Sequence, residues 1–236
     1  MAPTRRKLSA HCKPSSSRVR AYPNVPPRWE AGNWSGYAIK GKSNSYRSIS
    51  GYWIVPRVRP SATNKYSSAW LGIDGFGNSS LIQAGTEHDY VNGKSVYYAW
   101  WEIIPATETR IPYPVSPKDL MYARISKLRN KKWLIMLANK TKGWTFRTVQ
   151  TYTGPAATAE WIMEAPTVNG KTARLANYGI TRFDKCRLNQ KNPWLQPSNR
   201  GVMIQNVRVV STPSLPGKNK DNFFVAYGSK PPRPPS

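Results

Sequence analysis

Carboxylates are the residues most able to perform chemistry in this 236-residue chain. Six of its eleven Asp and Glu fall in or beside short runs rich in β-branched and aromatic residues: Asp74, Glu87, Asp89, Glu102, Glu160 and Glu164. A carboxylate can take a proton from water and return it to a leaving group, while a neutral donor stabilises the developing oxyanion. Two carboxylates could instead hydrolyse a glycosidic bond, and Glu102, Glu160 and Glu164 could supply such a pair. Each acid taken alone has a simpler interpretation: it occupies a solvated strand position beside Lys or Arg.

The chain has too few residues of the required types for the other common catalytic arrangements. The chain has no Gly-x-Ser-x-Gly motif, and His88 is the only histidine in the region expected to fold, so a Ser or Cys triad is not expected. The histidines His11 and His88 and the cysteines Cys12 and Cys186 are too few for a convincing zinc or copper centre. We therefore expect no metal and no cofactor. One disulfide could form from the two cysteines, but nothing in the sequence supports it.

Short segments rich in Val, Ile, Tyr, Trp and Thr alternate with Gly, Pro, Asn and Ser, at 34–39, 49–55, 67–74, 95–104, 120–128, 132–138, 144–151, 173–183, 202–210 and 222–227. This spacing predicts many short antiparallel strands. Asn92-Gly93 and Asn169-Gly170 each predict a two-residue hairpin turn. Long helical periodicity is absent. The sequence therefore predicts an all-β fold, a sandwich of two antiparallel sheets of the jelly-roll or concanavalin-like kind, in a single domain.

Side-chain alternation along three of the expected strands separates an apolar face from a face with tryptophan or carboxylates. The second faces are expected to carry Trp70 and Asp74 in 67–74, Tyr98, Trp100 and Glu102 in 96–104, and Glu160 and Glu164 in 159–164. Side by side, these faces would form an aromatic, acidic groove on an otherwise basic protein.

The chain is strongly basic, with 36 Lys and Arg against 11 Asp and Glu and a formal net charge of +25. Such a charge predicts attraction to nucleic acid, anionic membranes or acidic polymers without choosing among them. The positive residues are scattered and no nucleic-acid-binding motif is present, so a generally cationic surface is favoured and a nucleic-acid partner is not expected. No apolar run approaches the length of a membrane span, and no export signal is visible.

Composition divides the chain into three regions. Residues 1–30 are rich in Ser, Pro and Arg and are expected to form a flexible basic segment, and residues 229–236 a Pro-rich tail. The folded domain is expected to occupy residues 31–228, and we expect it to be a monomer.

Six motifs follow one another in order between about residues 33 and 164: Asn33-Trp34-Ser35-Gly36-Tyr37-Ala38, Gly51-Tyr52-Trp53-Ile54-Val55-Pro56, Ser68-Ala69-Trp70-Leu71-Gly72-Ile73-Asp74-Gly75, Leu81-Ile82-Gln83-Ala84-Gly85, Tyr98-Ala99-Trp100-Trp101-Glu102 and Ala159-Glu160-Trp161-Ile162-Met163-Glu164. Together they resemble the glutamic peptidases, or eqolisins. The resemblance implies a two-sheet sandwich whose groove cleaves polypeptides in acid with a Gln and Glu dyad and no metal. It also suggests a secreted protein, although the compartment stays open because no signal is visible.

Carried over position by position, the resemblance puts the catalytic glutamine on Gln83 and the catalytic glutamate on Glu164. Glu164 would take a proton from water and later give it to the departing amine, while the Gln83 amide would bind the water and then the oxyanion. Glu160 lies on the same expected strand face and is the alternative base. The positions that support the dyad or contact substrate are matched by Trp70, Asp74, Glu87, Trp100, Glu102 and, as a neighbouring acid, Glu160.

The sequence also departs from the fungal pattern of that family. Tyr98 stands where an acid is expected, and Ala165-Pro166 follow Glu164 where an acidic and aromatic pair is expected. The family's paired cysteines are missing, and the chain is basic where secreted fungal members are acidic. A prokaryotic-type member is the more natural comparison, and the substrate preference is left open.

Two other classes of function compete with a peptidase. The first is a binding module for peptide or carbohydrate that keeps a tryptophan-lined groove without hydrolysis. The second is a cationic protein that docks on nucleic acid through phosphate contacts. A binding module needs neither Gln83 nor Glu164, and the chain has both, so the enzyme is favoured.

Overall fold

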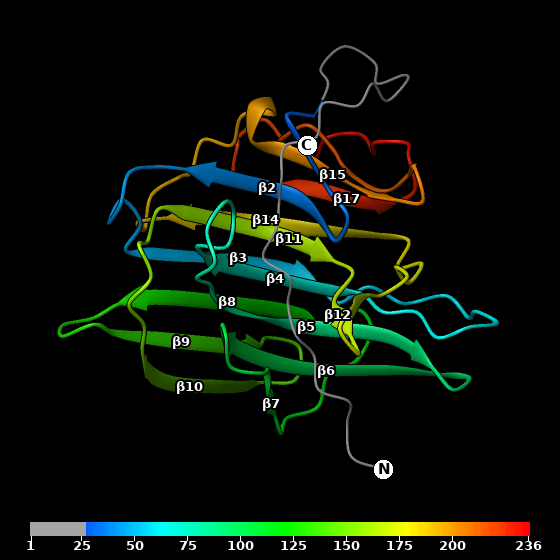
Figure 1. Cartoon of the computed structure of the whole chain (residues 1–236), viewed down its shortest axis with the longest axis horizontal. Helices are drawn as coiled ribbons and strands as arrows, with labels where there is room; N and C mark the ends of the chain where they lie inside the picture. Colours follow the sequence, from blue (N-terminus) through cyan, green and yellow to red (C-terminus); the bar gives the residue numbers. More distant parts are fainter. Residues whose placement is uncertain (1–26) are drawn as a thin grey trace.

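The computed structural model describes residues 27–236, and β-strands make up nearly all of its regular structure (Figure 1). The strands are β1 (Trp29–Ala31), β2 (Trp34–Lys40), β3 (Ser48–Ile54), β4 (Ser68–Ile73), β5 (Ile82–Val91), β6 (Lys94–Ile103), β7 (Thr109–Ile111), β8 (Leu120–Lys127), β9 (Lys132–Asn139), β10 (Trp144–Thr151), β11 (Thr158–Glu164), β12 (Thr167–Val168), β13 (Lys171–Thr172), β14 (Ile180–Leu188), β15 (Arg200–Gln205), β16 (Arg208–Pro213) and β17 (Phe223–Tyr227). A 3-10 turn covers Pro197–Asn199, and the described residues contain no α-helix. The predicted all-β, single-domain fold is confirmed.

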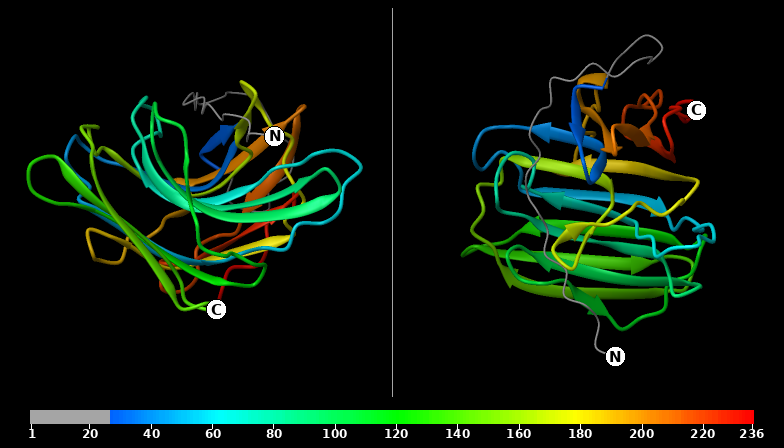
Figure 2. Two further views of the ribbon diagram at one scale, coloured as in Figure 1. Left: turned by 90° about the horizontal axis from the view of Figure 1, so that it is seen from below. Right: turned by 45° about the vertical axis from the view of Figure 1, so that its right-hand side comes forward.

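Two curved layers are stacked in this fold (Figure 2). Hydrogen bonds connect the strands in the order β10-β9-β8-β3-β14-β17-β16-β15-β2-β11-β4-β5-β6-β7. We call β10, β9, β8, β3, β14 and β17 the back layer and the strands from β15 to β7 the front layer; β16 joins the two. All pairs along this order are antiparallel, and β1 adds to β15 as a parallel strand. The predicted sandwich of antiparallel sheets is therefore present as one ladder that folds over.

Buried side chains from both layers form the main hydrophobic core. Trp53 on β3 and Trp161 on β11 are fully buried there. The indole N–H of Trp53 donates to the hydroxyl of Thr86 on β5 at 2.8 Å, and that of Trp161 donates to the carbonyl of Ser50 on β3 at 3.1 Å. Each bond joins the front layer to the back layer, so these two tryptophans fix how the layers are stacked as well as filling the space between them.

Both predicted hairpin turns are confirmed. Asn92-Gly93 joins β5 to β6 with φ angles of 51° and 75°. Asn169-Gly170 joins β12 to β13 with φ angles of 50° and 76°. Two successive positive φ angles are the geometry of a type I′ turn, which asparagine and glycine adopt at low cost.

The segment 202–210, expected as one strand, is two. Strand β15 ends at Gln205 and β16 begins at Arg208, because Asn206 and Val207 turn the chain with φ angles of 51° and 58°. A β-branched residue seldom adopts positive φ, so Val207 concealed this turn in the sequence.

Only the end of the segment 173–183, also expected as a strand, belongs to one. Strand β14 begins at Ile180 and continues to Leu188. The backbone N–H groups of Ala173 and Ala176 donate instead to the loop carbonyls of Pro166 and Tyr66. For strand β5, the sequence pattern predicts only the C-terminal end, Tyr90-Val91, and not the rest of the strand.

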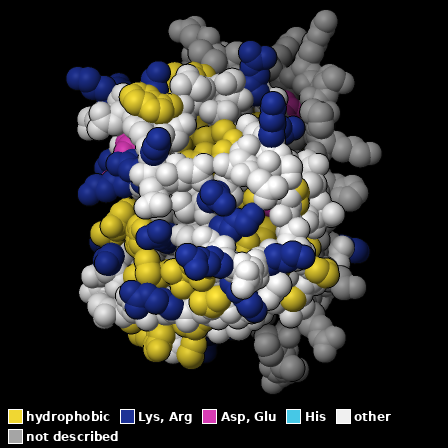
Figure 3. Space-filling view, turned by 90° about the vertical axis from the view of Figure 1, so that its left-hand side faces the viewer, with side chains coloured by type: hydrophobic (Ala, Val, Ile, Leu, Met, Phe, Trp, Pro, Cys, Tyr) yellow, Lys and Arg dark blue, Asp and Glu magenta, His cyan; other side chains and the backbone are white. Residues whose placement is uncertain are grey.

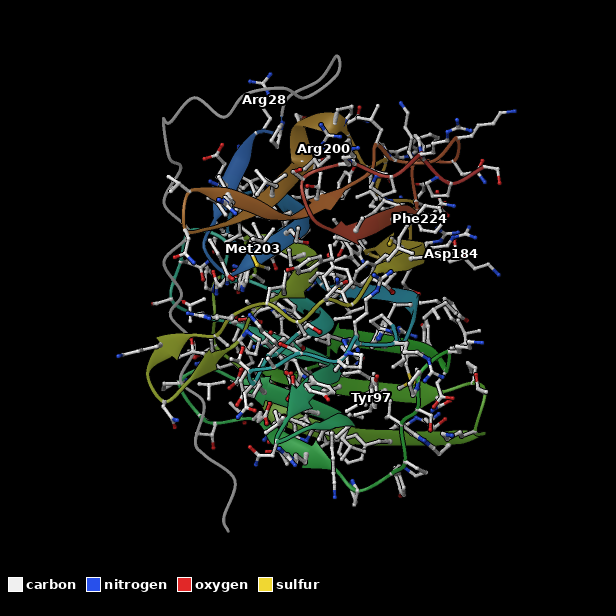
Figure 4. The ribbon with its side chains drawn as sticks, turned by 90° about the vertical axis from the view of Figure 1, so that its right-hand side faces the viewer. Arg28, Tyr97, Asp184, Arg200, Met203 and Phe224 are labelled. Carbon is white, nitrogen blue, oxygen red and sulfur yellow. The ribbon has the colours of Figure 1, made fainter. Side chains whose placement is uncertain are left out.

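The front layer places its strands across most of the height of the molecule. Arg200, at the start of β15, lies near the top of the view in Figure 4, and Tyr97 on β6 lies in the lower half. After β17 the described chain contains no further strand, and Pro235 is buried with its carbonyl oxygen beside Gly217.

Cys186 is a buried free thiol. Cys12 and His11 lie outside the described residues, as does most of the 1–30 segment, and no described helix is long and apolar enough to span a membrane.

His88 lies inside the main core rather than on the acidic face. The Thr86 hydroxyl accepts the Trp53 indole N–H and lies 2.8 Å from Nε2 of His88, so it can donate its own hydrogen to a neutral imidazole. Burial lowers the pKa of His88 to about 3. Because the unfolded chain takes up a proton near pH 6.5 and the folded chain does not, His88 makes stability fall as pH drops from about 6.5 to about 3.

We predict that His88→Gln weakens this acid-side loss of stability, since glutamine can accept the Thr86 hydrogen bond but does not titrate. Between pH 7 and pH 4 the parent should lose about 3 kcal/mol more of its free energy of unfolding than the variant. Urea titrations of both proteins at the two pH values measure this difference. Equal losses in parent and variant would contradict the role of His88.

Candidate active site

The front layer brings the predicted site residues onto one face, except Asp74, which lies just beyond the end of β4. Directly opposite residues of antiparallel strands point to the same side of a sheet, so the strand register groups them in three cross-strand rows. The rows are Glu164, Ser68 and Glu87; Ile162, Trp70, Gly85 and Trp100; and Glu160, Gly72, Gln83 and Glu102. The alternating residues, such as Leu71 and Trp161, lie in the main core on the other side. The predicted division into an apolar face and an aromatic, acidic face is confirmed.

A second, smaller apolar cluster covers this face between the acids. It contains Trp29, Ala31, Trp34, Ala38, Trp70, Leu81, Tyr98, Trp100 and Ile162. The rings of Trp34 and Trp70 meet edge to face, with centroids 4.9 Å apart. Carboxylates set among these indoles experience a less polar surrounding than carboxylates on an open strand.

Glu164, at the end of β11, is held by two side-chain donors. The indole N–H of Trp70 donates to Oε2 at 2.7 Å, and Nδ2 of Asn33 donates to Oε1 at 3.5 Å. Donors at both oxygens stabilise the ionised carboxylate and fix its orientation. The sequence reasoning did not assign a role to Asn33, although it stands beside Trp34 in the first quoted motif.

Gln83 is held in a similar way on β5. Its Nε2 donates to Oε2 of Glu102 on the neighbouring strand at 2.6 Å, and the two residues are directly opposite in the register. An amide nitrogen carries two hydrogens, so one remains for another acceptor. Oε1 of Gln83 is buried and has no hydrogen-bond partner among the described residues.

Trp70 lies between these two hydrogen-bonded pairs. At one end its N–H contacts Glu164; at the other, Cζ3 would lie 3.0 Å from a Cβ atom added to Gly72, which is the residue directly opposite Gln83. A Cβ atom at Gly85 would lie 2.5 Å from Cβ of Trp70, so glycine leaves the space that this side chain needs. Gln83 and Glu164 are thus related by a diagonal across β4, with the indole between them.

Glu160 is fully buried in the same row as Gln83, and neither carboxylate oxygen has a partner in hydrogen-bond geometry within the described part of the chain. Burial raises its pKa well above the usual range, and the charge of Asp74 adds to the rise. The hydroxyl of Thr158 and the backbone amide of Phe76 act against the shift but do not cancel it. The surroundings of Glu160 therefore favour its protonated, neutral form.

Asp74 anchors a loop. Its carboxylate accepts the Tyr152 hydroxyl at 2.6 Å, the backbone N–H groups of Ala156 and Ala157 at 2.7 and 2.9 Å, and Nδ2 of Asn78 at 3.1 Å. Three of these bonds tie the end of β4 to the segment before β11, and the fourth comes from the loop between β4 and β5. Asp74 therefore supports the loop that leads into the strand of Glu160 and Glu164, and no described contact joins it to Gln83.

Glu87 and Trp100 lie on the predicted face at its other side. Glu87 is buried in the row of Glu164, with the small Ser68 between them. Trp100 is buried in the row of Trp70, and its indole N–H has no acceptor among the described residues. No group of three or more His, Cys, Asp or Glu in residues 27–236 is arranged to hold a metal ion.

The edge beyond Trp100 carries a small polar group that the sequence analysis missed. The Tyr98 hydroxyl donates to Oε1 of Glu108 at 2.9 Å, and the Arg110 guanidinium lies 3.7 Å from the centre of the Tyr98 ring. Arg110 on β7 is directly opposite Trp100. The sequence places Tyr98 on the aromatic, acidic face and shows its departure from the fungal pattern, and the structure adds a partner from the following loop.

Comparison with known proteins finds one family over most of the chain. The sequence pattern of the Peptidase A4 family matches residues 32–220. Aspergillopepsin-2 from Aspergillus niger is 24% identical over 224 residues, covering 83% of this chain and 77% of that protein. The crystal structure of scytalido-glutamic peptidase with a transition state analog inhibitor superposes with a TM-score of 0.71 at 19% identity, over 83% of this chain and 98% of that one.

The eqolisin SCP-B, solved in a complex with the tripeptide Ala-Ile-His, superposes with a TM-score of 0.66 at 19% identity, again over 83% of this chain and 98% of that one. These structures share the two-layer fold described above. With the family pattern covering most of the described residues, the chain belongs to the Peptidase A4 family, the glutamic peptidases or eqolisins, and is a hydrolase of peptide bonds.

Proposed function

We propose that this protein is an acid-acting endopeptidase in which Gln83 and Glu164 form the catalytic dyad. The observation that supports it most is the placement of both side chains on one face of the front layer, each held by a hydrogen bond and separated by the Trp70 indole. The related structures bound to a transition state analog and to a tripeptide support a polypeptide substrate.

In the proposed reaction, Glu164 acts first as a base. Ionised Glu164 takes a proton from a water molecule, whose oxygen attacks the carbonyl carbon of the peptide bond. The free N–H of the Gln83 amide donates to the carbonyl oxygen as it becomes negative. Protonated Glu164 then gives its proton to the departing amine, which breaks the C–N bond and regenerates the carboxylate. The Glu102 carboxylate fixes which way the Gln83 amide points, because it accepts the other N–H.

Two differences in environment favour Glu164 over Glu160 as the base. Donors from Trp70 and Asn33 stabilise a negative charge on Glu164. Burial raises the pKa of Glu160, so this residue keeps its proton at the pH values where an acid peptidase works. A protonated carboxyl group cannot accept a proton from water, and Glu160 is therefore assigned a supporting role.

We predict that Glu164→Gln lowers kcat by about 10²- to 10⁴-fold, because the general base is lost. Gln83→Ala should lower it by about 10²- to 10³-fold, because the oxyanion loses its donor. Glu160→Gln is the matched control, with the same substitution on the same face of β11, and should keep kcat within about tenfold of the parent. Cleavage of denatured protein near pH 2 to 5, a range set by the usual pKa of a carboxyl base, measures all three.

Several outcomes of that assay decide between mechanisms. Full turnover in both Glu164→Gln and Gln83→Ala would refute the dyad. Loss of activity in Glu160→Gln alone would transfer the role of base to Glu160. Peptide binding by the parent without hydrolysis at any acid pH would favour a binding module.

A second prediction follows from the buried carboxyl of Glu160. As pH rises, the unfolded chain releases this proton near pH 4.5, whereas the folded chain keeps it to a higher pH. The contribution of Glu160 to stability is therefore complete below pH 4.5 and is lost as pH rises toward the pKa of Glu160 in the folded state. Glu160→Gln is neutral at every pH and should raise Tm at pH 7 while changing Tm little at pH 4. About 2–4 °C of Tm corresponds to each 1 kcal/mol in a chain of this size. Thermal unfolding of both proteins at the two pH values measures it, and an equal change in Tm at both would contradict the raised pKa.

A further inference from the structure

The back layer carries a basic cleft that the peptidase reaction does not use. It has a volume of about 890 Å³ and lies where β3, β8, β9 and β10 meet the turn after β14. Its charged lining residues are Arg47, Arg124, Lys127, Arg129 and Lys132. Figure 3 faces this end of the molecule and shows Lys and Arg side chains gathered over it, with few Asp or Glu.

The positive charges of the basic cleft are not balanced by neighbouring acids. Residues 120–151, which include β8, β9 and β10, contain eight Lys and Arg and no Asp or Glu. All eleven acids of the chain lie within the described residues, and none of the five cleft cations has a carboxylate oxygen within 4.0 Å. Unpaired cations that converge on one concave surface raise the local concentration of anions.

The floor of the basic cleft is small, polar and ordered. Ser48 and Ser126 are directly opposite each other on β3 and β8, and both are largely buried. Nε of Arg124 donates to the Ser126 hydroxyl at 2.7 Å, which holds this guanidinium against the floor. Oδ1 of Asn189 accepts the backbone N–H groups of Arg47 and Ser48 at 2.7 and 3.2 Å, so the rim is fixed as well.

An aromatic pair lies next to the basic cleft on the same face of the back layer. Tyr52 and Tyr122 are cross-strand neighbours with ring centroids 4.7 Å apart, and both are half-buried. Tyr122 is two residues from Arg124 on β8, which places it about 7 Å away on the same face. Nζ of Lys185 lies 5.8 Å from the centre of the Tyr52 ring, and Asp184, directly opposite Tyr52 on β14, is paired with Arg182 at 3.1 Å.

We infer that the basic cleft and the Tyr52–Tyr122 pair form a binding site for single-stranded nucleic acid. Phosphodiester groups would contact the cleft cations, and bases would stack on the tyrosine rings, a combination typical of single-strand binding on β-structure. Phosphodiesters keep their charge in acid, whereas carboxylate polymers lose theirs. The site is on the back layer and does not depend on the assignment of the dyad. The expectation of no nucleic-acid partner rested on scattered positive residues in the sequence, which the fold gathers at this end.

The test is the binding of a labelled oligo(dT) to the full chain, followed by fluorescence anisotropy over a range of salt concentrations. The double variant Arg124→Ala with Lys127→Ala should raise Kd at least about tenfold and reduce the slope of log K against log salt by about 1.4, since each lost phosphate contact removes about 0.7. Lys94→Ala with Lys218→Ala is the matched control. It removes the same charge from exposed positions outside the cleft and should change Kd by less than about twofold.

The aromatic part of the site is tested with Tyr52→Leu and Tyr122→Leu together. This variant should raise Kd for oligo(dT) about tenfold and leave binding of inorganic polyphosphate unchanged, because polyphosphate has no bases to stack. Unchanged Tm and peptidase activity show that each variant is folded.

Two results would overturn the inference. An equal loss of affinity in the cleft variant and its matched control would show that only net charge matters. Equal binding of oligo(dT), polyphosphate and anionic lipid vesicles, with no effect of the tyrosine substitutions, would show an anion surface that does not recognise bases.

Discussion

Side-chain alternation in the front layer is the constraint on which the rest of the structure depends. The strands β11, β4 and β5 must each bury one face against the back layer, so every second residue is committed to the main core. The remaining residues are forced onto the opposite face whatever their polarity. A shift of one residue in the register of β5 would move Gln83 into the core and replace it with Ala84 or Ile82. The stacking of the two layers and the composition of the site are thus fixed by the same pattern.

This dependence explains why so much of the site could be predicted from the sequence. The alternation in Trp70 to Ile73 and in Glu160 to Glu164 assigns a face to each residue before any contact is known. The cross-strand partners then follow from the order of the strands, and the structure pairs Gln83 with Glu102 directly. The roles proposed for Gln83 and Glu164 rest on resemblance to the family, since alternation alone treats Glu160 and Glu164 alike. Their environments within the described residues separate them, because Trp70 and Asn33 donate to Glu164, whereas no donor there meets Glu160 in hydrogen-bond geometry.

Other features depend on contacts between distant segments and have no local signal. Asn33 meets Glu164 because β2 and β11 are neighbours, although 131 residues separate them in the chain. The four donors to Asp74 come mainly from the segment 152–157, whose sequence gives no sign of a carboxylate partner. The basic cleft combines a local and a distant contribution. Four of its five cations lie within residues 124–132, the hairpin of β8 and β9, and the fold brings Arg47 beside them from the segment before β3.

The two buried titratable groups with the largest consequences act in opposite directions on stability. His88, in the main core, makes the folded state less stable as pH falls from about 6.5 to about 3. Glu160, on the acidic face, makes it less stable as pH rises above 4.5. As pH rises past 4.5 the two slopes oppose each other, and below 4.5 only the histidine acts. The histidine thus sets the acid limit of stability, and the glutamate opposes the gain in stability that the histidine alone would give as pH rises toward neutrality.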